Sequence, residues 1–155
     1  MTVTVFLDNT TDERTAPTEG QFQAWVDCAL ITAENKIAES VENVTISIVD
    51  KEKSAVLNET FRSKSGPTNV LAFSYDPIPG FSEESLGDLA ICPDILKKEA
   101  EAQGIPITAH WAHLTIHGIL HLLGYDHLND DDAAIMESLE IKALKQFGFE
   151  NPYAE

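Results

Sequence analysis

Hydrophobic residues alternate in some segments of the chain and recur every three or four positions in others. Residues 2–8 (TVTVFLD) alternate like a strand with one buried face, and the β-branched segment 43–50 (NVTISIVD) predicts a second strand. Between them, apolar residues recur at helical spacing from Phe22 to Ile37 and predict an amphipathic helix over 18–38. Strands and helices are therefore expected to be mixed along the chain.

Two later helices are predicted together with the residues that they bury. The first covers residues 51–61, and the last begins near Asp130, which is a good N-cap residue. The residues expected to be buried are Ala55, Leu57 and Phe61 in the first of these helices and Ile135, Met136, Leu139 and Ala143 in the last.

The remaining segments complete an α/β sandwich. Pro93 can open a helix, because its missing N–H has no partner in a first turn. The other predicted elements are strands at 69–75 and 86–92, a loop at 76–85, and helices at 93–103 and 106–123. We therefore expect one α/β domain over residues 1–155, with a small sheet covered by helices. The pattern does not specify the order of the strands.

Composition narrows the class of protein. A hydrophobic content of 43% with only seven prolines argues against disorder. No apolar run is long enough to span a membrane, and the N-terminus lacks the basic and apolar regions of a signal peptide, so we expect a cytoplasmic protein without a membrane partner. Cys28 and Cys92 lie far apart and fit no paired-ligand spacing, so we expect reduced packing residues.

The net charge of −16, from ten basic and twenty-six acidic residues, excludes a general surface for polyanions, because affinity for a phosphate backbone scales with the cations presented. A nucleic acid would have to bind a local patch. Residues 126–140 carry six carboxylates and no lysine or arginine, and we expect this run to be solvated surface. Four of the ten basic residues do cluster: Lys51, Lys53, Arg62 and Lys64.

All five histidines lie between residues 110 and 127. On the predicted helix 106–123, the first four of them occupy an arc of about 80° at 100° per residue. The other faces of that helix are apolar, so we expect a central helix whose imidazole stripe lines a cleft. His110, at the far end of the stripe, is expected to be structural.

Three of these histidines have the spacing of a catalytic zinc-type site. His117 and His121 are one helical turn apart and can reach one ion. Gly124 can end the helix in a left-handed conformation, which lets His127 supply a third ligand from the following loop. Three nitrogen ligands with an open fourth position describe a catalytic site rather than a closed structural one. The alternative is a row of ordinary packing histidines.

Three further residues are candidates near such a site, each with an ordinary alternative. His113 can orient a ligand, contact a substrate or merely pack. Arg62 offers a fork of donors that matches a phosphate, or forms a surface ion pair. Asp126, beside His127, can orient an imidazole or serve as a general base.

The spacing H-x3-H-x2-G-x2-H is also that of zinc endopeptidases of the metzincin type. Those enzymes carry a glutamate general base directly after the first histidine, whereas this chain has Gly118. A peptidase mechanism would therefore lack its general base in this chain. A bound metal can still lower the pKa of water from 15.7 to about 7. Such chemistry suits a phosphodiester, where positioning and charge neutralisation supply most of the catalysis.

The segment 117–127 (HGILHLLGYDH) resembles the hallmark motif of the YbeY family of bacterial rRNA maturation factors. The resemblance extends over about residues 43–153, with departures at Asn69, where an aspartate is common, and at Ala72, where a serine is usual. Further similar pieces follow in order: Leu57-Asn58, Phe61-Arg62, 67–73 (PTNVLAF), 86–92 (LGDLAIC), 136–140 (MESLE), Gly148 and 151–153 (NPY).

This resemblance implies an α/β fold with a mixed four-stranded sheet, about five helices and a metzincin-like metal helix. It implies one zinc per chain on the three motif histidines, although imidazoles also accept nickel, copper and iron. The implied activity is a single-strand-specific endoribonuclease in 16S rRNA 3′-end maturation and ribosome quality control, with Arg62 as the functional arginine. The implied partners are single-stranded rRNA, the small ribosomal subunit and an assembly factor such as a ribosomal protein or GTPase.

Two other classes of function stay open at this point. One is a ribosome-assembly factor whose metal is mainly structural, which the missing glutamate and the negative charge both favour. The other is a peptidase or another metal-dependent hydrolase of small substrates, which the metzincin-like spacing favours.

Overall fold

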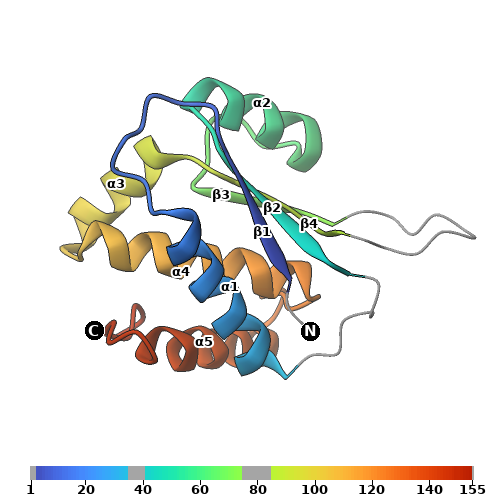
Figure 1. The fold of residues 1–155 in the computed structure, drawn as a ribbon, viewed down its shortest axis with the longest axis vertical. Helices are drawn as coiled ribbons and strands as arrows, with labels where there is room; N and C mark the ends of the chain where they lie inside the picture. Colours follow the sequence, from blue (N-terminus) through green and yellow to red (C-terminus); the bar gives the residue numbers. More distant parts are fainter. Residues whose placement is uncertain (1–2, 35–40, 75–84, 155) are drawn as a thin grey trace, which may run out of the picture.

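The structure is a computed structural model that describes residues 3–34, 41–74 and 85–154 (Figure 1). Four strands form one sheet in the order β1-β2-β4-β3, in which β3 is antiparallel to β4 and the other neighbours are parallel. The strands are β1 (Thr4–Asn9), β2 (Asn43–Ile48), β3 (Val70–Phe73) and β4 (Ser85–Ile91), and the helices are α1 (Glu19–Ala33), α2 (Lys51–Arg62), α3 (Pro93–Gln103), α4 (Ile107–Leu122) and α5 (Asp130–Lys145). The expected mixed α/β fold is confirmed.

Helices lie on both faces of the sheet (Figure 1). Alternation along β2 places Val44, Ile46 and Ile48 on the face that α1 and α4 cover, where all three are fully buried. The opposite face carries α2 and a smaller apolar cluster of Val49, Leu71 and Ala90. The sheet therefore has one thick apolar layer and one thin layer.

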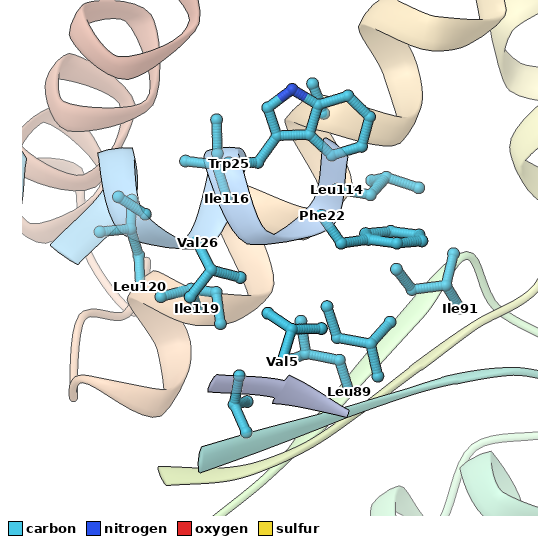
Figure 2. Packing of buried hydrophobic residues seen from close by; sticks show 14 of the residues in the cluster. Val5, Phe22, Trp25, Val26, Leu89, Ile91, Leu114, Ile116, Ile119 and Leu120 are labelled. Atoms are coloured by element: carbon cyan, nitrogen blue, oxygen red, sulfur yellow. The ribbon is translucent and has the colours of Figure 1, made fainter. Parts of the chain in front are cut away.

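The main core is formed by α1 and α4 on the sheet, with α5 against both helices (Figures 1 and 2). Phe22 meets Trp25 and Trp111 edge to face, with ring centroids 5.6 and 5.9 Å apart. Ile116 and Ile119 of α4 are fully buried in the same layer. Because α4 is covered on several sides, its position is determined by packing rather than by helix propensity.

The burial predicted for α2 is wrong for Phe61 and only partly met for the other two residues. Phe61 is 63% exposed, and Ala55 and Leu57 are only half-buried. The buried face of α2 instead consists of Ser54 and Asn58, which hydrogen-bond the backbone of Thr68 and Gly66 at 2.9–3.0 Å. The helix is thus held to the following loop by polar contacts that hydrophobic periodicity cannot predict.

In α5, the prediction of buried residues is correct for two of the four positions. Ile135 is 55% exposed, whereas Met136 and Ala143 are buried as expected and Leu139 is half-buried. Glu140 occupies the same face as Met136 and is fully buried. A carboxylate thus takes a fully buried position at which hydrophobic periodicity predicts no residue.

Most predicted element ends lie within two residues of the observed ones. The exception is the helix expected over 18–38, which ends at Ala33 because Glu34 adopts a left-handed conformation with φ 50°. The rest of that prediction and residues 76–84 of the loop predicted over 76–85 lie outside the described residues, whereas Ser85 is already the first residue of β4. Cys28 and Cys92 are free thiols, as expected. No helix in the described ranges is both long and apolar enough to span a membrane.

Glu13 connects the segment between β1 and α1 to α3. Its carboxylate forms a hydrogen-bonded ion pair with Lys97 and accepts the backbone N–H of Thr15 at 3.0 Å. The hydrogen bonds from Lys97 and Thr15 outweigh partial burial and lower the pKa of Glu13 to about 2. The ionised carboxylate is therefore the form that the folded chain favours.

The variant Glu13→Gln is expected to lower the free energy of unfolding by up to about 1 kcal/mol at neutral pH. Because the folded pKa lies below the ordinary value of 4.5, this loss is complete above pH 4.5 and shrinks as the pH falls towards 2. Urea denaturation of both proteins across that range measures the difference. A difference that stays constant down to pH 2 would show that the charge of Glu13 does not contribute.

Candidate active site

The cleft beside α4 is built around three imidazoles that the fold brings together. His117 and His121 lie on the last turns of α4, and Gly124, with φ 100°, reverses the chain directly after the helix. His127 then enters from the loop before α5. One ring nitrogen from each of the three histidines lies within 4.8 Å of the other two.

This arrangement fits a transition-metal ion. The Nε2 atoms of His117 and His121 are 3.0 Å apart, close to the edge of about 3.3 Å that zinc–nitrogen bonds of 2.0–2.1 Å give in a tetrahedron. The ring of His127 lies 5.2 Å from that of His121 and 5.8 Å from that of His117, measured between centroids. Burial, together with the neighbouring His117, lowers the pKa of His121, which favours the neutral form that binds metals. The described histidines can therefore hold a metal ion.

A buried glutamate lies behind the first of these histidines. Glu140 on α5 is fully buried and accepts a hydrogen bond from Nδ1 of His117. The hydroxyl of Tyr153 donates to the other oxygen of Glu140 at 2.5 Å. Burial alone would raise the pKa of Glu140, but the nearby His113 and the hydrogen bonds from His117 and Tyr153 outweigh it and lower the pKa to about 2.

The prediction that the whole acidic run 126–140 is solvated surface is therefore wrong for Glu140. Asp130 and Asp131 at the start of α5 are exposed as expected. The only sequence signal for the burial of Glu140 was its helical spacing, four residues after Met136 and three before Ala143. Because Glu140 is charged, its helical spacing was not counted as a sign of burial.

His110 and His113 take different places on the imidazole stripe. His110 is buried, 2.9 Å from the carboxylate of Glu99 on α3, and burial lowers the pKa of this histidine. No described contact joins His110 to the three converging imidazoles, which agrees with the structural role expected for it. His113 lies 3.2 Å from the hydroxyl of Tyr153, and 3.5 Å from Glu140. His113 is thus part of the polar cluster that Glu140 and Tyr153 form beside Nδ1 of His117.

Arg62 and Asp126 line the same cleft as the three histidines, and the cleft has a volume of about 440 Å³. Arg62 is the exposed last residue of α2, and within the described ranges no carboxylate forms an ion pair with it. Asp126 accepts the backbone N–H of His127 at 2.8 Å, while its 3.6 Å separation from Nδ1 of that ring is too long for a hydrogen bond. In this geometry Asp126 holds the backbone of His127 rather than its ring.

The position that carries a glutamate in metzincins is closed by packing in this chain. Gly118 lies on the α4 face that meets β4, where a Cβ atom would come within 2.7 Å of Cδ2 of Leu89. Leu89 is itself fully buried and has little room to move. A longer side chain at position 118 would therefore separate α4 from the sheet.

The variant Gly118→Ala is expected to lower the free energy of unfolding by about 1 kcal/mol. Overpacking a core costs roughly 1–3 kcal/mol, and the better helix propensity of alanine offsets roughly 1 kcal/mol of that. Gly20→Ala is the matched control, because Gly20 is exposed in α1 and its nearest atom to a new Cβ is 3.8 Å away. Denaturation of the metal-free proteins measures both. Equal stability of the two variants would contradict the close contact with Leu89.

Comparisons with known proteins agree with this architecture. A family model described as Endoribonuclease YbeY matches residues 6–148. Endoribonuclease YbeY of Coxiella burnetii, from strain Dugway 5J108-111 and equally from strain RSA 331 / Henzerling II, is 49% identical over 156 residues that cover 99% of each chain. A solution structure of a Thermotoga maritima protein is similar with a TM-score of 0.56 at 22% identity, over 91% of this chain and 88% of that one, which supports the fold alone.

The mixed sheet, the histidine-bearing helix and the matched family model together define an RNA-cleaving hydrolase. The chain belongs to the YbeY endoribonuclease family.

Proposed function

We propose that this chain is a zinc-dependent, single-strand-specific endoribonuclease that acts in the cytoplasm on the 3′ end of 16S rRNA and in ribosome quality control. The observation that carries the proposal is the convergence of three imidazoles and Arg62, which pairs with none of the described carboxylates, on a single cleft. The family to which the chain belongs supplies the class of reaction.

Each residue of the cleft has a distinct task in this proposal. His117, His121 and His127 hold one zinc ion, which would supply positive charge and lower the pKa of a water molecule. Arg62 binds the non-bridging phosphate oxygens through two parallel N–H donors. Asp126 keeps the loop of His127 in place through the backbone N–H of that residue.

The dimensions of the cleft support a single-stranded substrate. A volume of about 440 Å³ lies in the range of sites that hold one small molecule. One extruded nucleotide with its phosphates fits this volume. Proteins that read RNA by sequence generally bind unpaired nucleotides, because the deep, narrow major groove of an RNA helix hides its base edges.

The charge of the chain supports dependence on a partner. A net charge of −16 opposes binding of free RNA, and the few cations near the cleft, such as Arg62 and Lys64, act only locally. We propose that the small ribosomal subunit, or an assembly factor bound to it, delivers the rRNA to the cleft. A mainly structural metal in an assembly factor is the second candidate, favoured by the absence of a glutamate at position 118.

The variant His117→Ala is expected to lose both bound zinc and RNA cleavage. Wild-type protein purified without an affinity tag should contain about one zinc per chain by elemental analysis and should cut single-stranded RNA. Removal of zinc with a chelator should abolish cleavage, and added zinc should restore it. Cleavage at the wild-type rate by His117→Ala would point to a contaminating nuclease. A zinc-loaded wild type without any cleavage would favour the structural role.

The variant Arg62→Ala is expected to lower kcat/KM by about 10²–10³-fold, because one charge-stabilising donor group at the reacting phosphate is lost. Arg62→Lys should recover only part of this loss, since an ammonium does not bind phosphate with two parallel N–H groups. Lys98→Ala on the exposed side of α3 removes the same charge away from the cleft and is the control. Similar kinetics for the Arg62 and Lys98 variants would remove Arg62 from the proposal.

A further inference from the structure

The segment after α5 returns to α4 and contacts it through the side chain of Tyr153. After α5, Gly148 turns the chain with φ 78°, and Phe149 packs against the main core. Tyr153 then places its ring 5.5 Å from that of His113, measured between centroids. Its hydroxyl reaches Glu140, although the residue as a whole is partly exposed.

The donors and acceptors among His113, Tyr153 and Glu140 can be assigned from the hydrogen bonds that they form. The hydroxyl of Tyr153 donates to Glu140, and burial beside that carboxylate keeps the hydroxyl protonated. The oxygen of Tyr153 can then only accept from Nε2 of His113, 3.2 Å away. Among the described residues Nδ1 of His113 is buried without a partner, as suits a ring nitrogen that carries no proton.

The same group is not a second metal site. One oxygen or nitrogen from each of His113, His117 and Glu140 lies within 4.8 Å of the others, so distance alone would allow an ion. The Nδ1 atom of His117, however, donates its proton to Glu140 and has no free lone pair. The second oxygen of Glu140 already accepts from Tyr153. These atoms form a hydrogen-bonded chain instead.

We propose that Glu140 and Tyr153 are positioning residues for the metal centre, which makes the segment after α5 part of that centre. With its proton on Nδ1, His117 presents the lone pair of Nε2 to the cleft and to His121. The buried carboxylate fixes this tautomer and makes the ring a more basic ligand. Tyr153 satisfies the other oxygen of that carboxylate and holds it in place. This inference rests on the three-histidine metal site proposed above.

Zinc affinity tests the proposal without any measurement of activity. Competition with a chromophoric chelator gives the dissociation constant of zinc for each full-length variant. Glu140→Gln should weaken binding by about 10- to 100-fold and Tyr153→Phe by about tenfold, the range found for partners of metal-binding histidines. Glu137→Gln is the matched control: it removes the same charge from α5 at a half-buried position, and no described hydrogen bond joins Glu137 to a histidine.

A second readout separates positioning from mere stability. Nitrogen-15 NMR of the metal-free protein should show His117 protonated on Nδ1 in the wild type and a mixture of tautomers in Glu140→Gln. Wild-type zinc affinity in both the Glu140 and Tyr153 variants would overturn the inference, and so would an unchanged tautomer. Tyr153→Phe changes only a hydroxyl near the chain end, so it keeps the test valid if the Glu140 variant does not fold.

His117→Ala distinguishes failure of this inference from failure of the proposed function. If His117→Ala loses zinc while the Glu140 and Tyr153 variants bind it normally, only the positioning role is wrong. If His117→Ala binds zinc as tightly as the wild type, the three-histidine site itself is wrong, and the inference falls with it.

Discussion

The close contact between α4 and β4 at Gly118 is the constraint on which the rest of the structure depends. Because position 118 has no side chain, α4 lies directly on Leu89, and this contact sets the rotation of the helix. With Gly118 facing the sheet, His117 and His121 face the cleft, and the apolar positions on either side fill the main core. The orientation of two candidate ligands is thus a consequence of core packing.

The same constraint separates this site from that of a metzincin. A glutamate at position 118 would point into Leu89 and lose the contact between helix and sheet. The carboxylate nearest in role, Glu140, instead lies on α5 and contacts the far side of His117. It is placed to orient a ligand rather than to take a proton from water. Such a site suits a reaction in which positive charge and positioning matter more than a strong general base.

Much of the architecture could be predicted from periodicity, because one-sided burial leaves a clear pattern in β2 and α1. Prediction failed where polar groups are buried. Ser54 and Asn58 face inward only because the loop at 66–68 offers them backbone partners. The end of α1 was also missed, since nothing in the sequence marks Glu34 as left-handed. Neither the polar contacts of α2 nor the left-handed Glu34 leaves a trace in hydrophobic periodicity.

The candidate site divides in the same way. The three histidines could be predicted to converge, because a one-turn spacing and a helix-ending glycine are local features. For Arg62, the residues alone left a phosphate-binding role and a surface ion pair open, and the family resemblance favoured the first; its place in the cleft could not be predicted from local sequence, since α2 is distant from α4. Glu140 and Tyr153 were missed because one lies within an acidic run and the other follows all the predicted elements. Their role depends on tertiary contacts across 23 and 40 residues, to His117 and His113 respectively.

X-ray absorption at the zinc edge of the zinc-loaded, untagged protein tests the central claim most directly. The account predicts three imidazole nitrogens at about 2.0–2.1 Å and one oxygen ligand from water. A sulfur ligand, or fewer than three imidazoles around the metal, would contradict the site formed by His117, His121 and His127.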